Sequence, residues 1–164
     1  MLGGILKKET CAACRFCCSF RRTSLWEAPV FTYENMLVLK DDPFFDGSDL
    51  TVYLEDYTYA KYDLSDKYKT DDPNEEVPCP YLGEKGCTLS EREKPWDCKI
   101  WPLRVMNKDG EIVVALTPTC PSINRLDFET VKEFVDTNLK KDIIEYANNH
   151  PYLIKEYRSD YPII

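Results

Sequence analysis

The sequence predicts an α+β fold with a small, cysteine-rich, metal-centred core, short β-hairpins and a long C-terminal helix. Three observations favour this class. Eight cysteines lie between residues 11 and 120, β-prone segments separated by turn residues occupy the middle of the chain, and apolar residues recur at helical spacing near its end. We expect one domain, 1–164, with a cysteine-cluster metal-binding region at 11–120 and a C-terminal helical segment at 121–164.

A short helix is predicted over residues 33–40. Thr32 precedes it and can accept a hydrogen bond from a free backbone N–H, which is the role of an N-cap. The dipeptide Asp42-Pro43 follows and would end the helix, because proline disfavours helical backbone before it. The apolar residues expected to face a core are Met36, Leu37 and Leu39.

Three hairpins are predicted after this helix. Residues 50–64 alternate apolar and polar side chains, and the segment between Cys79 and Cys87 contains two glycines suited to a tight turn. Residues 103–116 hold two β-prone runs separated by Asn-Lys-Asp-Gly, which is strong turn chemistry. The acidic, proline-containing stretch at 70–78 is expected to be a surface loop.

A long helix is predicted from Asp127, its N-cap, to about residue 148. Apolar residues recur through it at helical spacing, and His150-Pro151 should end it. The only histidine, His150, is best explained as a cap at the helix end, where a cation is favoured by the helix dipole. The tail, 152–164, carries enough apolar side chains to dock on the domain or on a second subunit.

Composition restricts the classes of partner and compartment. The chain has 29 acidic and 21 basic side chains and a formal charge of −8, so it lacks the basic footprint typical of nucleic-acid or anionic-membrane binding. We therefore expect no nucleic-acid or membrane partner, while a protein partner stays open. The sequence contains neither a secretory signal nor a long apolar span, which predicts a cytoplasmic protein with reduced thiols.

The cysteines begin with a dense run at the N-terminus, Cys11-x2-Cys14-x2-Cys17-Cys18. Gaps of two residues let a tight loop or single helical turn direct several sulfurs to one point. Cys11, Cys14 and Cys17 share the spacing that opens bacterial ferredoxin motifs, although Arg21 replaces the expected fourth cysteine. Because Cys17 and Cys18 are adjacent, we expect them to serve different centres.

Four later cysteines complete the count for two four-coordinate centres that would each use both groups. All-cysteine sites are typical of structural zinc and of iron–sulfur clusters, and eight thiolates suit two zinc ions. Disulfides and buried reduced thiols are the alternatives. The cysteines form about 5% of the chain, below the roughly 8–10% of a disulfide scaffold. The expected metal ligands are Cys11, Cys14, Cys17, Cys18, Cys79, Cys87, Cys98 and Cys120.

The order of these residues resembles the YkgJ-type cysteine-cluster family. The resemblance rests on the CxxCxxCC run, on Cys79-Pro80-Tyr81-Leu82, on Gly86-Cys87-Thr88-Leu89, and on Lys94-Pro95-x2-Cys98-Lys99-x-Trp101-Pro102. It covers residues 11–120. The family usually has arginine where this chain has Lys94 and Lys99, which keeps the charge but not the bidentate geometry.

The resemblance implies a zinc- or iron-chelating domain. The favoured function is a metal module that stabilises a fold or recruits a protein partner. One alternative is an iron–sulfur electron carrier. Another is a protein-modifying enzyme, because longer proteins with a similar pattern include the flagellin lysine N-methylases, although the six glycines form no Gly-x-Gly loop for a nucleotide cofactor. Whether the chain is an enzyme is left open.

Several other residues are candidates for supporting a metal site. Trp96 and Trp101 flank Cys98 and either shield a centre from water or belong to the core. Five basic residues lie near cysteines and could donate hydrogen bonds to thiolates, or could be solvated surface charges. They are Arg15, Arg21, Arg22, Arg92 and Lys99.

Overall fold

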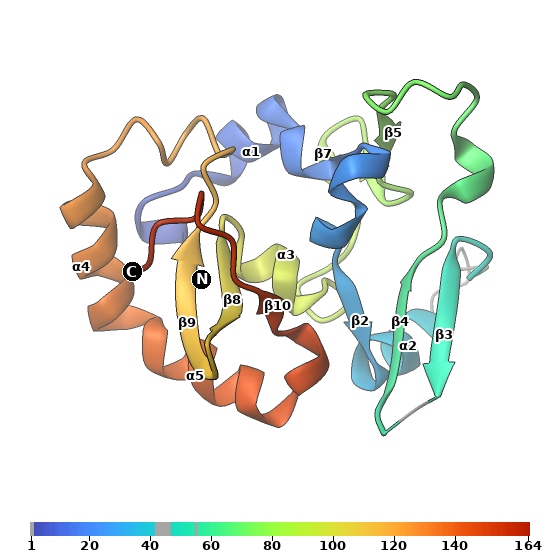
Figure 1. Cartoon of the computed structure of the whole chain (residues 1–164). Coiled ribbons are helices and arrows are strands. Elements are labelled where there is room, and N and C mark those ends of the chain that lie inside the picture. Colours follow the sequence, from blue (N-terminus) through green and yellow to red (C-terminus); the bar gives the residue numbers. More distant parts are fainter. Residues whose placement is uncertain (1, 42–46, 55) are drawn as a thin grey trace. The chain divides into compact units, whose positions relative to one another are not determined.

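The computed structural model describes residues 2–41, 47–54 and 56–164. It divides the chain into two compact units (Figure 1). Unit 2 is Cys11–Cys98, and unit 1 combines Met1–Thr10 with Lys99–Ile164. Helices and small sheets occur in both, so the α+β class is confirmed. The prediction that Asp42-Pro43 ends a helix lies outside the described residues.

A three-stranded antiparallel sheet forms one part of unit 2. The hairpin predicted over 50–64 consists of β3 (Leu50–Leu54) and β4 (Thr58–Tyr62), and β4 lies in the middle of the order β2-β4-β3. The third strand, β2 (Val30–Thr32), is buried along its whole length. The sheet therefore joins a local hairpin to β2, whose residues lie 27 to 31 positions before their partners in β4.

Helix α2 (Tyr33–Lys40) has the bounds predicted from the sequence. It follows β2 directly and packs on β2 and β4 (Figure 1). Met36 and Leu39 face the sheet and are buried, as expected, but the prediction for Leu37 was wrong because its side chain is 44% exposed. One residue advances a helix by about 100°, so Leu37 lies on the flank of the stripe formed by the other two.

Thr32 is the N-cap of α2, and its hydroxyl accepts a hydrogen bond from the Asn35 N–H at 3.3 Å. Replacing Thr32 with alanine should lower the free energy of unfolding of unit 2 by about 1 kcal/mol, since a buried backbone donor loses its partner. Thr32→Ser keeps the hydroxyl and should lose less than half of that. Urea denaturation of both variants checks this, and equal losses would contradict the capping role.

Two hydrophobic clusters form the core of unit 2. The first lies between α2 and the sheet, where Phe31 and Leu39 are fully buried and Tyr81 packs against them. The second contains Phe20 and Leu64. Tyr62 contacts both clusters and so connects them.

Short elements make up the rest of unit 2, and most of them carry or flank cysteines. Two helices cross the unit boundaries, α1 (Lys8–Cys14) and α3 (Trp96–Ile100). The remaining elements are η2 (Phe16–Cys18), β1 (Ser19–Phe20), η3 (Arg22–Glu27), η4 (Ser65–Lys67), β5 (Val77–Pro78), β6 (Leu82–Gly83) and β7 (Gly86–Cys87).

Unit 1 is built on the hairpin predicted over 103–116. Strands β8 (Leu103–Lys108) and β9 (Glu111–Leu116) pair in full antiparallel register. Asp109 and Gly110 join them with φ angles of 53° and 92°. Two successive positive φ angles are the signature of a type I′ turn, whose twist matches that of the strands.

The tail docks on its own unit and covers both edges of this hairpin. Strand β10 (Lys155–Glu156) pairs in parallel with β8. On the opposite edge, Ile163 forms a bridge to Ala115 in β9. Covering both edges satisfies backbone groups that would otherwise be exposed. Unit 1 also contains the short helices η1 (Leu2–Gly4) and η5 (Pro151–Leu153).

The predicted C-terminal helix is observed as two consecutive helices, α4 (Phe128–Asn138) and α5 (Lys140–Asn149). Asp127 is the N-cap, as expected, and its carboxylate accepts the Thr130 N–H. Leu139, with φ −132°, interrupts the helix. The buried residues recur every four positions, and each such step rotates about 40° past a full turn. A single straight helix would therefore turn this row of residues away from its neighbour, and an interruption resets the direction. The row stays buried in both helices, at Val131, Val135, Ile143 and Ala147.

Candidate thiolate metal centre

The N-terminal cysteine run lies on two consecutive short helices. Cys11 and Cys14 lie on α1, and Cys17 and Cys18 lie on η2. Arg15 separates the two helices with a left-handed backbone, φ 58°, and its N–H donates to the Cys11 carbonyl oxygen. The chain therefore changes direction in the middle of the run.

Cys17 and Cys18 have their Sγ atoms 3.9 Å apart. Sulfurs bound to one tetrahedral zinc ion, with Zn–S bonds of about 2.3 Å, are about 3.8 Å apart. The observed spacing thus suits two ligands of one ion as well as two thiolates at the border between neighbouring ions. The expectation that Cys17 and Cys18 serve different centres therefore stays a prediction.

Cys79 lies beside this pair because β1 and β5 form a two-stranded antiparallel ladder. The ladder continues with a hydrogen bond of 2.7 Å from the Cys79 N–H to the Cys18 carbonyl oxygen. The stretch 70–78 is thus not a loop throughout, since its last two residues form β5. This pairing connects cysteines about sixty residues apart.

Cys87 lies on the hairpin β6–β7, which packs on the N-terminal cysteine run. A Cβ at Gly86 would lie 3.1 Å from the Ala12 Cβ, so the glycine allows close contact with α1. The Arg15 guanidinium donates a hydrogen bond to the carbonyl oxygen of Glu84 in the turn of this hairpin. These contacts hold the hairpin that carries Cys87 against the N-terminal cysteine run.

Cys98 lies on α3 and is exposed. Two neighbours on the same helix hold it in unit 2. Trp96 is buried, which places it in the core, and the carboxylate of Asp97 accepts a hydrogen bond from the Val30 N–H at 3.1 Å. The helix is therefore tied to the central sheet through β2.

The charge interactions of Cys17 connect both halves of the cysteine pattern. Its pKa is raised by the hydrogen bond with Cys18 and by burial. The negative charges of Cys18, Cys98 and Cys11 raise it further. Such repulsion is relieved by a cation, because a metal ion favours the deprotonated sulfur.

A second group of thiols surrounds Cys18. Burial raises the pKa of Cys79 to about 11, against the lowering effect of a hydrogen bond from Tyr62, and the charges of Cys18 and Cys87 add to the increase. The pKa of Cys87 is also raised, first by burial, with Cys18 among the further causes. Cys17 and Cys18 thus lie where two groups of thiols meet.

Cys18 itself is activated. The hydrogen bond with Cys17 and the positive charges of Lys94 and Arg15 outweigh burial and lower its pKa to about 7. The two pKa shifts have opposite directions, which favours a thiolate on Cys18 over one on Cys17. The arrangement resembles the electropositive surroundings of other reactive cysteines.

In the metal-free, reduced chain, Cys18 should therefore react with iodoacetamide before Cys87 at neutral pH, although Cys87 is the more exposed thiol. A lowered pKa means that the thiolate is present at lower pH, so the labelling midpoint of Cys18 should lie near 7. Peptide mass spectrometry over a pH series measures this. Lys94→Met should move the labelling midpoint of Cys18 to higher pH, whereas Lys85→Met should leave it unchanged. Labelling rates that follow only the exposure of each thiol would contradict the lowered pKa of Cys18.

All eight cysteines lie in the described part of the chain, and all are free thiols. Only Cys120 is buried, in unit 1, so the explanation as ordinary buried cysteines does not fit the other seven. Cys14 is exposed at the end of α1. Within the described residues, no three Cys, His, Asp or Glu side chains are already arranged to hold a metal ion.

Two of the five predicted basic neighbours have another role. Arg21 pairs with Glu76, and Arg22 donates to carbonyl oxygens of the 70–78 stretch while its guanidinium lies over the Tyr68 ring. These arginines hold that stretch in place. Two residues near the thiols were missed, Lys94 and Tyr62. Lys94 lies four residues before Cys98 in the quoted motif, which was the available signal for the first, and no local signal identifies the second.

The remaining candidates belong to unit 1. Trp101 lies under the guanidinium of Arg104, 4.6 Å from ring centroid to Cζ. His150 ends α5 and stacks on Tyr146 at 4.1 Å, with its Nδ1 2.9 Å from the Tyr146 carbonyl oxygen. His150 therefore acts as a helix cap, as expected.

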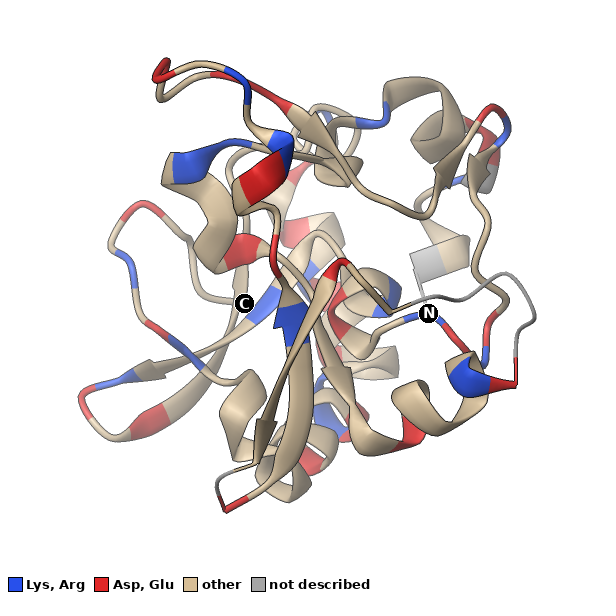
Figure 2. Cartoon of the chain, turned by 90° about the vertical axis from the view of Figure 1, so that its right-hand side faces the viewer, with Lys and Arg blue, Asp and Glu red and all other residues tan. Residues whose placement is uncertain are grey.

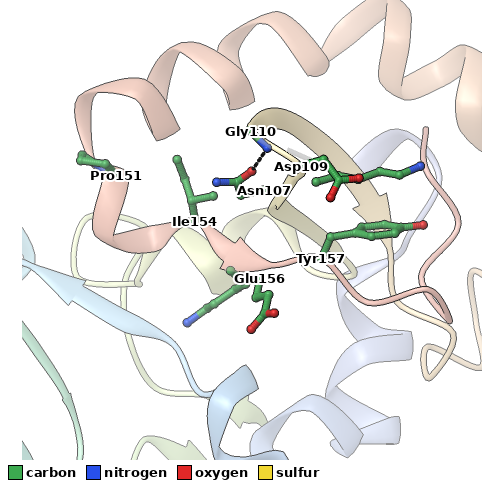
Figure 3. Close-up of a pocket in the computed structure, with 9 residues that line it drawn as sticks. Asn107, Asp109, Gly110, Pro151, Ile154, Glu156 and Tyr157 are labelled. Atoms are coloured by element: carbon green, nitrogen blue, oxygen red, sulfur yellow. Dashed lines mark hydrogen bonds between the residues drawn. The ribbon is translucent and has the colours of Figure 1, made fainter.

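An open hollow of about 700 Å³ lies at the turn of the β8–β9 hairpin. Figure 3 shows Asn107, Asp109 and Tyr157 around it, with the Gly110 N–H hydrogen-bonded to the Asn107 side chain. Its lining includes no cysteine. Acidic and basic residues are interspersed along the chain (Figure 2), so charge does not single out this hollow as a binding site.

Among the described residues, every helix is too short or too polar to cross a bilayer. Compared with models of known protein families, with curated proteins and with solved structures, the chain matches none.

Proposed function

We propose that unit 2 is a thiolate metal-binding module that takes zinc and serves a structural or partner-recruiting role. The observation that carries this proposal is the set of six interacting thiols around the Cys17–Cys18 pair, whose sulfurs are 3.9 Å apart. Zinc bound there would supply the cross-links that short elements cannot supply themselves. The resemblance to the YkgJ-type pattern points to the same function.

The charge interactions suggest how the ligands divide. Cys17 would bind one ion with Cys11 and Cys98, and Cys18 would bind a second ion with Cys79 and Cys87. The 3.9 Å between the adjacent sulfurs lets either thiolate bridge the two ions.

Two expected ligands are less constrained. Cys14 is exposed on α1, one helical turn from Cys11, and is the natural further donor within unit 2. Cys120 lies in unit 1, and its role as a ligand stays a sequence-based prediction.

The spacing of the adjacent sulfurs also bears on the choice of metal. In a [4Fe–4S] cluster each thiolate binds a different iron, whereas in a [2Fe–2S] cluster two thiolates share one iron. A separation of 3.9 Å therefore favours a single ion or a two-iron cluster over a four-iron cluster. The fold offers the methylase-like enzyme no specific support.

Anaerobic purification followed by elemental analysis tests the proposal. We expect a colourless protein with two zinc ions per chain, and Cys18→Ser should lose about one of them. Ser19→Ala, the neighbouring residue, is the matched control and should keep both, while Cys120→Ser tests that ligand separately. A brown sample that contains iron and sulfide would establish the cluster instead, and a metal-free wild-type chain would end the proposal.

A reducing compartment such as the cytoplasm fits this function. Eight free thiols stay reduced there, and thiolates bind metal only in the reduced state.

A further inference from the structure

Tyr62 belongs to the hairpin predicted over 50–64, and its ring lies between the two hydrophobic clusters of unit 2. It ends β4, opposite Leu50. Its centroid is 5.2 Å from that of Phe31, in an edge-to-face arrangement, and 5.7 Å from that of Phe20. The aromatic neighbours restrict the ring and therefore the direction of its hydroxyl.

The hydroxyl of Tyr62 lies 3.2 Å from the Sγ of Cys79. Either atom can donate while the thiol keeps its proton. Once the sulfur is a thiolate, it can only accept, and the phenol O–H becomes the donor. The direction of the hydrogen bond is thus set by the state in which the cysteine binds metal.

We infer that Tyr62 is a positioning residue for Cys79: its phenol donates a hydrogen bond to the sulfur, orients it and withdraws negative charge from it. This inference rests on the proposed metal-binding function. Hydrogen bonds to ligands orient metal sites and tune their affinity and electronic properties. Cys79 is therefore expected to be a weaker electron donor to the metal than a ligand without such a partner.

Tyr68 supplies a matched control within the same cluster. It is also partly buried against Phe20 and Leu64, and its hydroxyl also makes one hydrogen bond. The acceptor, however, is the Phe20 carbonyl oxygen at 3.0 Å rather than a sulfur. Tyr68→Phe thus removes a comparable phenol hydrogen bond without touching a ligand.

The first experiment uses cobalt(II) as a probe of the thiolate ligands. Tyr62→Phe should shift the sulfur-to-cobalt charge-transfer band to lower energy, because a sulfur that loses a hydrogen bond gives up charge more readily. Tyr68→Phe should leave the band where it is in the wild-type chain. An unshifted band in Tyr62→Phe, or an equal shift in both variants, overturns the inference, and urea unfolding of both variants separates this effect from general loosening.

The second experiment uses the metal-free, reduced chain. Without the phenol the Cys79 thiol ionises less readily, because the hydrogen bond from Tyr62 lowers its pKa. The smaller fraction of thiolate at neutral pH should slow its alkylation in Tyr62→Phe by about fivefold, measured on the Cys79 peptide by mass spectrometry. Tyr68→Phe should react at the wild-type rate. An unchanged Cys79 rate in Tyr62→Phe refutes the hydrogen bond itself. If the wild-type chain takes up no cobalt, the proposed function and the role of Tyr62 toward a metal fail together, and alkylation still decides whether the hydrogen bond exists.

Discussion

Chelation of the metal from the zinc-loaded chain is expected to lower the stability of the cysteine-bearing segments of unit 2 against local opening, while unit 1 keeps its stability. These segments are short: β1, β5, β6 and β7 have two residues each. Two-residue strands have little stability in water, whereas structural zinc contributes roughly 10–16 kcal/mol of apparent binding energy in small peptides. The segments around the thiols should therefore open more often in the metal-free chain than in the zinc-loaded chain.

Hydrogen exchange read by mass spectrometry measures this effect. Peptides that cover 11–20 and 77–98 should lose protection on chelation, and the β8–β9 hairpin peptides should keep it. That hairpin has its own core, in which Val114 and Met106 are fully buried. Added zinc should restore protection in the chelated sample. Loss of protection in both units together, or in neither, would contradict the expected division.

Phe31→Ala is expected to cause the largest loss of stability of any single substitution in unit 2. Phe31 is fully buried and lies in edge-to-face contact with Tyr62. Its ring centroid is 6.1 Å from that of Tyr81. Truncation of a buried phenylalanine leaves a cavity and costs about 3–5 kcal/mol. The free energy of unfolding from urea denaturation of the metal-loaded chain should fall by that amount.

Leu54→Ala is the control on the same sheet. Leu54 is 78% exposed, so its loss should change the free energy of unfolding by no more than about 0.5 kcal/mol. Phe31→Ala also removes the ring that packs edge-to-face against Tyr62. The substitution should therefore weaken the contact between Tyr62 and Cys79. A loss below about 1 kcal/mol in Phe31→Ala would mean that the first cluster is not the core of unit 2.

Local signals in the sequence predicted local structure well. Thr32 and the residues after it predicted α2 with its observed bounds, and Asn107 to Gly110 predicted the turn of the β8–β9 hairpin. In both cases the interacting groups are within four residues of one another. Hydrogen-bond partners so close in the chain cost little loop entropy, and the residue types alone indicate them.

Other predictions failed because they depended on partners elsewhere in the chain. Leu37 is as apolar as Leu39, and only the position of the sheet under α2 leaves one exposed and the other buried. The interruption at Leu139 likewise depends on the hairpin that α5 packs against. Apolar spacing indicates that a helix has a buried face, but it does not show where the chain must break to keep that face on its neighbour.

The cysteine site was likewise predictable from the sequence only in its local features. The sequence by itself determined that four thiols lie within eight residues and that the set is suited to metal, because spacing and donor type are local properties. Only the tertiary structure decided that Cys79 continues the ladder from Cys18, that Lys94 acts on Cys18, and that Tyr62 meets the sulfur of Cys79. These contacts join segments separated by at least 17 residues, where β pairing and aromatic packing, rather than the neighbouring residues, determine which side chains meet.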